Sequence, residues 1–191
     1  MSRTFAPATL LPADEWVELQ LPWRQGFWEG LTPMTLMRLN PHWDVTAAPG
    51  PLFPVEDVLV EKKFTANPEM ASAPGRWSVR FPSVGLDLAA EAREEGRGTA
   101  LRWGFQPTEP LLLTTADARK TMEYWLPSLR EYYRLYESNS LKHRFWRMFM
   151  NRVMLTMNPA QRRICSFIFK FTLLELVFIG AVLIAYFKFI A

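Results

Sequence analysis

The spacing of hydrophobic and polar residues changes along the chain, and each spacing predicts a different kind of element. Between Val55 and Phe105 apolar residues alternate with polar ones, which is typical of strands in an antiparallel sheet with one solvated face. Val55–Thr65 and Trp77–Phe81 are predicted to be strands. Leu86–Phe105 carries two alternating runs joined by a glycine-containing loop, which predicts a β-hairpin.

From Ala116 the apolar period becomes that of a helix. Hydrophobic residues recur three and four positions apart and predict an amphipathic helix with the apolar stripe Met122, Trp125, Leu126, Leu129, Tyr133 and Tyr136. Asp117 is the predicted N-cap, and Pro127 is expected to kink or divide the helix. The fold class predicted from these patterns is α+β, with the antiparallel sheet packed on the long helix.

Prolines separate the start of the chain from this unit. Eleven of the 15 prolines fall within the first 82 residues, and their spacing forbids long helices there. Short helical turns are predicted at Ala13–Gln20 and Thr32–Leu39. We therefore expect a Pro/Trp-rich segment at 1–54, a sheet-and-helix unit at 55–137 that forms one domain with 13–54, and two C-terminal helical regions at 138–158 and 159–191.

The first of these regions, centred on Ser140–Met157, combines Trp, Phe and Met with Lys and Arg. This composition predicts an interfacial helix that lies on a membrane surface, and the alternative is an ordinary helix packed on the domain. Residues 138–191 carry a net charge of +7 and residues 1–137 a net charge of −4, which favours anionic lipid headgroups over nucleic acid as the partner. The predicted membrane-interface residues are Lys142, Arg144, Trp146, Arg147, Arg152, Arg162, Arg163 and Lys170.

The second region is a predicted transmembrane helix. Phe171–Phe187 contains a single charged residue, Glu175, and Lys170 and Lys188 stand at the two ends, where long side chains reach the headgroups. Basic flanks stay in the cytoplasm, and no signal segment opens the chain. We therefore expect a single-pass, tail-anchored protein with a cytoplasmic N-terminal domain and a C-terminus just across the membrane.

Glu175 is the most unusual residue of this span, because an intramembrane carboxylate is costly and usually faces protein or water. One interpretation is a residue close enough to the interface to be protonated or to reach water. The other is a hydrogen bond to a neighbouring membrane helix or a bound cofactor. Ala181 and Ala185 would allow close approach of such a helix. A lone span has no bundle of its own, so we favour a partner that contacts Glu175, Ala181 and Ala185.

The chain offers little to catalytic chemistry. It contains no nucleophile-elbow, phosphate-loop or dinucleotide motif, and no His, Cys or carboxylate spacing that would supply a metal site. His42 is interpreted as a loop residue and His143 as part of the basic region. The single cysteine, Cys165, excludes an intramolecular disulfide, and it is either buried, lipid-facing or a candidate for S-palmitoylation. We predict no cofactor, no metal and no enzymatic activity.

Tryptophan is concentrated near the start of the chain. Trp16, Trp23, Trp28 and Trp43 all lie among prolines in the first 43 residues. They are either packing residues of an irregular segment or an aromatic surface that docks on a partner protein, since Trp is favoured at interaction hot spots.

The stretch Pro74–Phe105, followed by Tyr124–Glu137, resembles the closing strands and C-terminal helix of the START/polyketide-cyclase-like (SRPBCC, helix-grip) domains. Leu39-Asn40-Pro41 is similar to their early helical segment. The resemblance covers about 13–137 and departs from the family in the proline-rich start, where no opening strand is visible. It implies a sheet that wraps the long helix and often encloses a cavity for a lipid or other hydrophobic ligand. It carries over no catalytic residue.

Two hypotheses of function follow. In the first, the protein is a non-catalytic accessory subunit whose cytoplasmic domain braces a larger membrane complex, and energy-transducing complexes, respiratory or photosynthetic, collect such subunits. In the second, it is a membrane-tethered START-like module that binds a lipid, a quinone or another hydrophobic ligand. A closed apolar cavity between sheet and helix would favour ligand binding. A core filled by Trp77, Trp103, Phe105 and Trp125 would favour the structural role.

Overall fold

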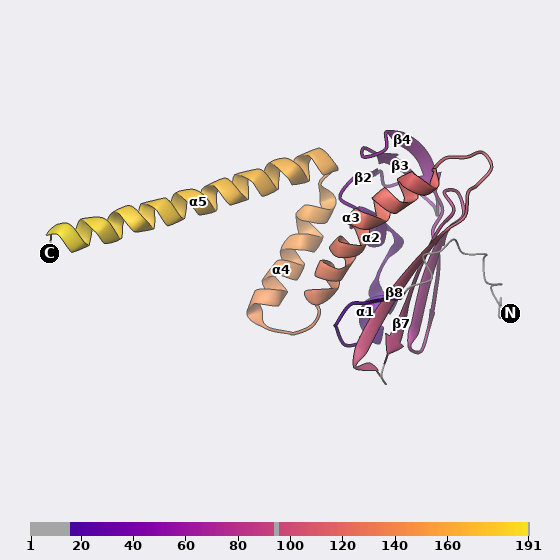
Figure 1. The fold of residues 1–191 in the computed structure, drawn as a ribbon, viewed down its shortest axis with the longest axis horizontal. Helices are drawn as coiled ribbons and strands as arrows, with labels where there is room; N and C mark the ends of the chain where they lie inside the picture. The colour runs from indigo at the N-terminus through magenta and orange to yellow at the C-terminus, as the bar shows by residue number, and fades with distance from the viewer. Residues whose placement is uncertain (1–15, 94–95, 191) are drawn as a thin grey trace.

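The computed structural model describes residues 16–93 and 96–190 and shows an α+β domain from which one long helix projects (Figure 1). All paired strands are antiparallel. The larger sheet has the order β1-β8-β7-β6-β5 and is built from β1 (Val17–Glu18), β5 (Glu69–Ala73), β6 (Arg76–Phe81), β7 (Leu86–Arg93) and β8 (Gly98–Phe105). The smaller sheet has the order β2-β3-β4 and is built from β2 (Trp43–Val45), β3 (Phe53–Asp57) and β4 (Lys62–Ala66).

The predicted hairpin is confirmed, with β7 and β8 paired from Leu86 opposite Phe105 to Arg93 opposite Gly98. The strand predicted over Val55–Thr65 is instead two strands, β3 and β4. Two local features turn the chain between them. The carboxylate of Asp57 accepts from the backbone N–H of Leu59 at 2.9 Å, and Glu61 takes a left-handed conformation with φ of 54°.

The helices are α1 (Gln25–Gly30), α2 (Pro33–Arg38), α3 (Thr115–Arg134), α4 (Leu141–Arg152) and α5 (Pro159–Ile190), with a 3₁₀ turn, η2 (Met154–Thr156), before the last. The predicted turn at Thr32–Leu39 is confirmed as α2, whose first turn is capped by Thr32. The predicted turn at Ala13–Gln20 is wrong where it is described. Residues 17 and 18 form β1 because β8 offers them an edge to pair with, and residues 13–15 lie outside the described residues.

The amphipathic helix predicted after Ala116 is confirmed as α3, with two corrections. Thr114 is the N-cap, and Asp117 is the third residue of a reciprocal capping box in which each side chain accepts from the other's backbone N–H. Pro127 does not divide the helix, which is continuous on both sides of it. Proline removes one hydrogen bond of the ladder, and the exposed position of Pro127 tolerates that loss.

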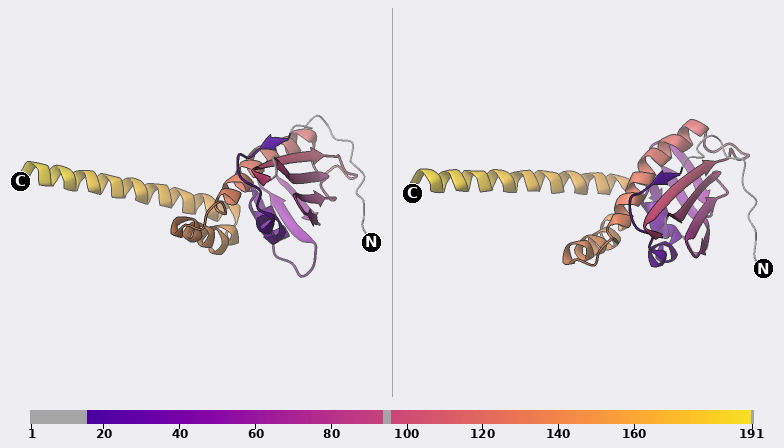
Figure 2. Two further views of the ribbon diagram at one scale, coloured as in Figure 1. Left: turned by 90° about the horizontal axis from the view of Figure 1, so that it is seen from below. Right: turned by 60° about the horizontal axis from the view of Figure 1, so that its bottom comes forward.

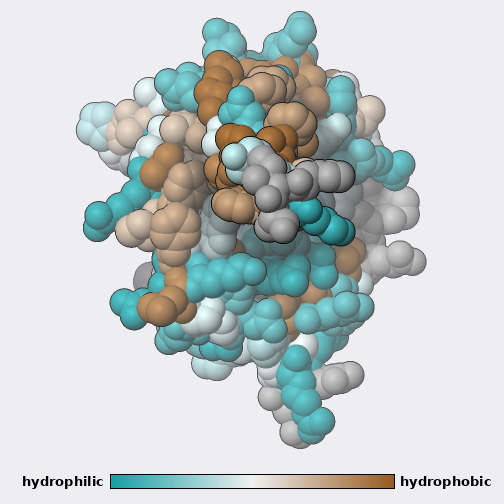
Figure 3. Space-filling model, turned by 90° about the vertical axis from the view of Figure 1, so that its left-hand side faces the viewer, coloured by the Kyte–Doolittle hydropathy of each residue, from teal (hydrophilic) through white to brown (hydrophobic). Residues whose placement is uncertain are grey.

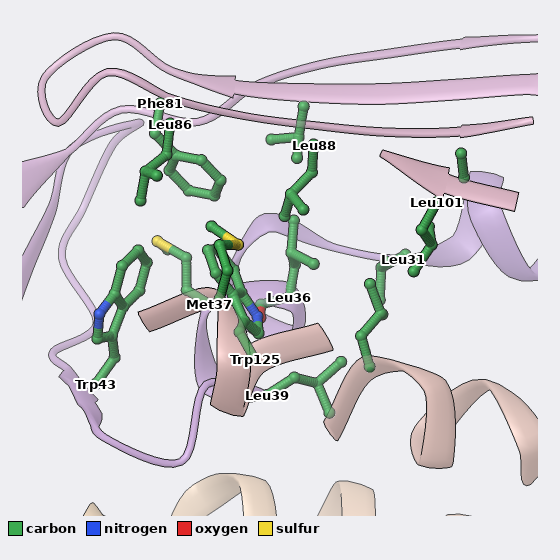
Figure 4. Packing of buried hydrophobic residues seen from close by; sticks show 14 of the residues in the cluster. Leu31, Leu36, Met37, Leu39, Trp43, Phe81, Leu86, Leu88, Leu101 and Trp125 are labelled. Carbon is green, nitrogen blue, oxygen red and sulfur yellow. The ribbon is translucent and has the colours of Figure 1, made fainter. Parts of the chain in front are cut away.

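Aromatic side chains fill the space between the larger sheet and α3. Figure 4 shows Phe81 and Leu86 pointing from the sheet toward Trp125 of α3, and the rings of Phe81 and Trp125 are 5.5 Å apart between centroids. Trp43 packs on Trp125 with centroids 4.6 Å apart. Of the four residues expected to fill a structural core, Trp77, Phe105 and Trp125 are buried and Trp103 is partly buried.

α5 stands away from the domain along most of its length (Figures 1 and 2). The stretch Pro159–Lys188 is long and apolar enough to cross a membrane, and none of its most apolar window is buried. Figure 3 views the molecule from the free end of α5 and shows hydrophobic side chains at the helix, surrounded by hydrophilic ones. The fold is therefore an α+β domain with an antiparallel sheet and a long C-terminal apolar helix.

Candidate functional site

The base of α5 is where segments far apart in the sequence meet. The second half of α3, α4, η2 and the loop after α2 all contribute to a pocket beside its first turn. Asn158 and Gln161 fix the start of the helix. The backbone N–H of Gln161 donates to Asn158 Oδ1 at 2.8 Å, and that of Asn158 donates to Gln161 Oε1 at 3.0 Å. With Pro159 at the first helical position, this capping arrangement defines where α5 begins.

Arg162 attaches the first turn of α5 to the domain. Its Nε donates to the carbonyl oxygen of Met157 at 2.9 Å, and its Nη1 donates to the carbonyl oxygens of Arg38 and Asn40. These bonds hold α5 against the loop that follows α2. Arg162 is half-buried, and its guanidinium contacts the domain. The sequence predicted Arg162 as a membrane-interface residue and did not predict this contact.

Arg163 makes a second contact with the same loop. Its Nη2 lies 3.1 Å from His42 Nδ1, and the His42 ring packs edge-on against Tyr124 with centroids 4.7 Å apart. Because arginine only donates, Nδ1 is the acceptor and must be unprotonated in this contact. Burial, followed by the charge of Arg163, lowers the pKa of His42 from its ordinary value of 6.5. His42 lies in a turn, as expected, and supports the attachment of α5.

α4 divides its apolar residues between two sides. Trp146 and Met150 are half-buried and line the pocket beside α5, whereas Leu141, Phe145 and Met148 are 82%, 54% and 49% exposed. The exposed three are spaced four and three residues apart, so they form one stripe along the helix. α4 runs obliquely to α5 (Figures 1 and 2). It packs on the domain with one side and leaves an apolar stripe exposed on another.

The basic residues of this region have different environments. The exposed ones are Lys142, Arg144, Arg152, Arg163 and Lys170. Arg147 is held by the domain instead: its Nη2 donates to Asn139 Oδ1 at 2.9 Å, and its guanidinium lies 5.1 Å from the centroid of the Tyr136 ring. Most of the predicted interface charge is therefore presented to the surroundings, while Arg147, Arg162 and, through His42, Arg163 contact the domain.

A pocket of about 470 Å³ opens between α3, α4 and the first turn of α5. Its wall is mainly hydrophobic and includes Leu39, Pro41, Leu135, Trp146, Met150 and Leu155. Arg38, Glu131 and Arg162 supply charged groups at the same pocket. A concave apolar surface of this volume with a few polar groups is typical of sites for small hydrophobic molecules. The sequence alone did not predict it, because its residues come from four separate segments.

A smaller hollow of about 270 Å³ lies on the other side of Tyr132. The Tyr132 hydroxyl donates to Asn151 Oδ1 at 2.7 Å and lies 3.0 Å from the Tyr136 hydroxyl. Burial and the hydrogen bond with Tyr136 both raise the pKa of Tyr132, so the phenol stays neutral. This polar group therefore joins α3 to α4 and is not suited to proton transfer near neutral pH.

The four N-terminal tryptophans do not form one docking surface. Trp28 and Trp43 are fully buried, so the prediction that they dock on a partner is wrong. Trp23 stacks on Trp28 with centroids 5.5 Å apart and is only partly buried. Trp16 is half-exposed, and the guanidiniums of Arg93 and Arg102 each lie 5.0 Å from its ring centroid. Packing of the irregular segment accounts for most of this tryptophan cluster.

The predicted contact residues of α5 lie on different faces. Glu175, Ala181 and Ala185 are all exposed. At 3.6 residues per turn, Ala181 lies about 120° and Ala185 about 80° around the axis from Glu175. Thr172 and Tyr186 lie within about 60° of Glu175 and share its side. The sequence predicted one helix contact through Glu175, Ala181 and Ala185. In the structure Glu175 lies on a polar side of α5, and Ala181 and Ala185 lie on a separate side with small residues.

Titratable and metal-binding groups are dispersed. Within residues 16–93 and 96–190, no three His, Cys, Asp or Glu side chains gather as metal ligands. His143 Nδ1 lies 2.7 Å from Ser138 Oγ at the start of α4, and Cys165 is half-exposed on α5. No hydrogen bond or ring contact among the described residues joins His143, Cys165 and His42.

Comparisons of the chain with protein-family models, with curated proteins and with solved structures found no match. The resemblance to START-like domains stays a prediction from the sequence pattern.

Proposed function

We propose that this protein is a non-catalytic, single-pass accessory subunit of a larger membrane complex, in which α5 crosses the bilayer and the α+β domain braces the complex from the cytoplasmic side. The observation that carries the proposal is the exposure of the long apolar helix α5. Its most apolar window has a mean hydropathy of 2.3 and no buried residue, while its base is held by the domain. Monomeric soluble proteins rarely expose an apolar surface of this extent, and a bilayer covers it.

Glu175 supports a protein partner inside the membrane. It is exposed on the apolar helix, and a carboxylate in hydrocarbon is costly unless it is neutral or hydrogen-bonded. Thr172 and Tyr186 lie on the same side of α5 and add two hydroxyl groups to that face. Polar side chains of this kind hold membrane helices together, at about 0.6–2 kcal/mol for each hydrogen bond. A neighbouring helix that presents a donor to Glu175 fits this face.

The base of α5 supports contact with the cytoplasmic leaflet. Lys142, Arg144, Arg152 and Lys170 are exposed around it, and α4, with its exposed apolar stripe, runs obliquely to α5. A helix in that position can bury its stripe among the headgroups while its cations meet anionic lipid. Basic residues next to a span favour the cytoplasmic side for the domain.

The alternative is a START-like module in which α3 is the gripped helix and a hydrophobic ligand lies between α3 and the sheet. Trp43, Phe81 and Trp125 occupy that space in this chain. The accessory-subunit proposal therefore has the better support, and any ligand must be sought elsewhere on the domain.

The test is purification of the tagged full-length protein from its native membrane in mild detergent, followed by identification of the chains that elute with it. Partner chains are expected with the wild type, and Glu175→Leu should lower their recovery about fivefold or more, because it removes a hydrogen bond inside the membrane. Leu174→Ile, at the adjacent position, is the matched control and should change nothing. A wild-type protein that elutes alone, or unchanged partners with Glu175→Leu, would contradict the proposal.

A further inference from the structure

We propose that the pocket at the base of α5 holds one anionic phospholipid, with its phosphate beside Arg38 and Arg162 and an acyl chain along the hydrophobic wall. This inference rests on the proposed insertion of α5 in a bilayer, and it adds a ligand site that membrane anchoring alone does not require. The pocket volume of about 470 Å³ accommodates part of a lipid, not the whole molecule.

The hydrophobic wall continues from the pocket onto the apolar surface of α5. Trp146 lines the pocket and reaches Phe169 of α5, with ring centroids 6.3 Å apart. Phe169 is exposed and directly precedes Lys170, at the edge of the proposed membrane span. An acyl chain can therefore run from the pocket past these two rings into the hydrocarbon without crossing water. The position of the pocket thus suits a molecule that is shared between the domain and the membrane.

The charged groups of the pocket favour an anion. Arg38 donates from Nη2 to the carbonyl oxygen of Val45 at 3.3 Å, and Arg162 donates to backbone carbonyls only. Among the residues that the structure describes, no carboxylate forms an ion pair with either guanidinium. Both keep N–H groups beyond those bonds, because a guanidinium carries five. Two such groups at one pocket match a phosphate in charge and geometry.

Glu131 is the acidic residue at the pocket, and its charge is already balanced on α3. Its carboxylate oxygens lie 3.6 Å from Arg130 Nη1 and 3.8 Å from Arg134 Nη1. Asp44 also attracts Arg162, although the two form no ion pair. With Glu131 balanced on α3 and Asp44 opposite one of the two guanidiniums, the pocket keeps a positive charge. A phosphate placed beside Arg38 and Arg162 would offset this remaining positive charge.

The rest of the pocket distinguishes a lipid from a peptide. The wall formed by Leu39, Leu135, Met150 and Leu155 has side chains without hydrogen-bonding groups. A peptide would bring backbone N–H and C=O groups that this wall cannot pair, and burying them unpaired is costly. An acyl chain has no such groups. The combination of an apolar wall and two guanidiniums therefore matches a phospholipid.

The test uses the full-length protein in nanodiscs of phosphatidylcholine and phosphatidylglycerol in equal amounts, released for native mass spectrometry. We expect one phosphatidylglycerol molecule retained per chain. Arg38→Gln should lower that retention about tenfold, because it removes one charge-assisted hydrogen bond to the phosphate. Arg152→Gln, which removes an exposed arginine outside the pocket, is the matched control and should retain the lipid.

A second pair of variants tests the pocket without changing any charge. Ser128 lines the pocket from α3 and its hydroxyl donates to the carbonyl oxygen of Tyr124. Ser128→Phe should fill the pocket and abolish retention, whereas Ser128→Ala removes the same hydroxyl, leaves the space open and should retain the lipid. Millimolar inorganic phosphate should not displace the lipid, since phosphate lacks the acyl chain.

Three results would overturn the site. They are equal retention of phosphatidylcholine and phosphatidylglycerol by the wild type, undiminished retention by both Arg38→Gln and Ser128→Phe, and complete displacement by inorganic phosphate, which would identify a phosphate site instead. Flotation of the same protein with vesicles separates this failure from that of the proposed function. A chain that floats without a retained lipid overturns the lipid site alone, and a chain that does not float overturns both proposals.

Discussion

The guanidinium of Arg162, in the first turn of α5, donates to the backbone carbonyl oxygen of Arg38 at the end of α2. The two residues are 124 positions apart in the chain. Arg162 also donates to Met157 just before α5, so one side chain bridges the loop after α2, the connection from η2 and the long helix. The apolar helix is therefore attached to the domain at a defined point.

Arg162→Ala is expected to loosen this attachment. The change removes hydrogen bonds from a charged donor to backbone carbonyls, and the expected loss is about 2 kcal/mol of unfolding free energy for the domain. Hydrogen exchange in detergent should become faster for the backbone amides of residues 38–43. Arg152→Ala removes an exposed arginine of α4 and serves as the control. Unchanged exchange in the Arg162 variant would show that the bridge does not hold the loop.

Acidification should weaken the contact of Arg163 with His42. Burial and Arg163 lower the pKa of His42 below 6.5, so the folded protein binds this proton less readily than the unfolded chain. The stability that depends on neutral His42 is present above the unfolded pKa and is lost as the pH falls through 6.5 toward the folded value. Urea midpoints measured from about pH 7.5 to about pH 5.5 should fall more for the wild type than for His42→Gln. His143→Gln should behave like the wild type.

Removing the carboxylate of Asp57 is expected to destabilise the domain strongly. Asp57 is completely buried and accepts from Trp43 Nε1 at 2.8 Å and from the backbone N–H of Leu59 at 2.9 Å. The Thr121 hydroxyl also donates to Asp57 at 3.4 Å. Asp57→Ala leaves all three donors without this partner, at about 3 kcal/mol in total. Chemical denaturation measures the difference. Glu56→Gln, on the same strand but exposed and paired with Lys63 at the surface, should change stability by less than about 1 kcal/mol.

Two glycines with positive φ should differ in their tolerance of a methyl group. Gly85 has φ of 69°, and a Cβ there would lie 1.7 Å from the carbonyl oxygen of Gln106. Gly96 has φ of 90°, and a Cβ there would have no neighbour within 4 Å. Gly96→Ala should cost about 1 kcal/mol from backbone conformation alone, and Gly85→Ala should cost several times that or prevent folding. Thermal unfolding of the two variants separates the cost of backbone strain from the cost of a steric clash. Equal losses of stability would contradict the predicted clash with Gln106.

The exposed stripe of α4 should enter the headgroup region of a bilayer. In a Cys165→Ser background, a spin label on Phe145→Cys is expected to collide more often with oxygen than with a water-soluble nickel complex when the protein is in anionic vesicles. A label on Glu123→Cys, exposed on α3, is the control and should show the reverse. Equal accessibility at the two positions would mean that α4 does not touch the membrane.

Local pattern was sufficient for the hairpin and for α5. β7 and β8 carry an alternating period together with a glycine turn, and most of α5 is a long apolar run with a single charge, Glu175, between Lys170 and Lys188, so neither depends on the rest of the chain. α1 could not be predicted in this way. Its six residues include two glycines, and it is held by Phe27 and Trp28, whose rings lie 4.4 and 5.1 Å from Tyr133 of α3. Tertiary packing overrides weak propensity there.

The site depended on tertiary contacts still more strongly. Arg162 was visible as part of a basic pair before an apolar run, a pattern that predicts headgroup contact and says nothing of Arg38. The turn Leu39-Asn40-Pro41 resembles a segment of START-like domains, but the hydrogen bond that the Asn40 carbonyl accepts and the place of the turn in the pocket wall follow only from the fold. Burial of Trp28 and Trp43 likewise reflects partners that are distant in sequence.

Because Arg162 and Arg163 attach α5 to the domain, the rotation of α5 about its own axis is fixed relative to the domain. From Arg163 to Glu175 the helix is unbroken, rises about 18 Å and turns about 100° per residue. The side of α5 that carries Glu175 therefore faces a fixed direction relative to α4 and the pocket. A partner bound at Glu175 meets the same side of the domain in every copy, and one residue inserted between Arg163 and Glu175 would turn that side away by about 100°.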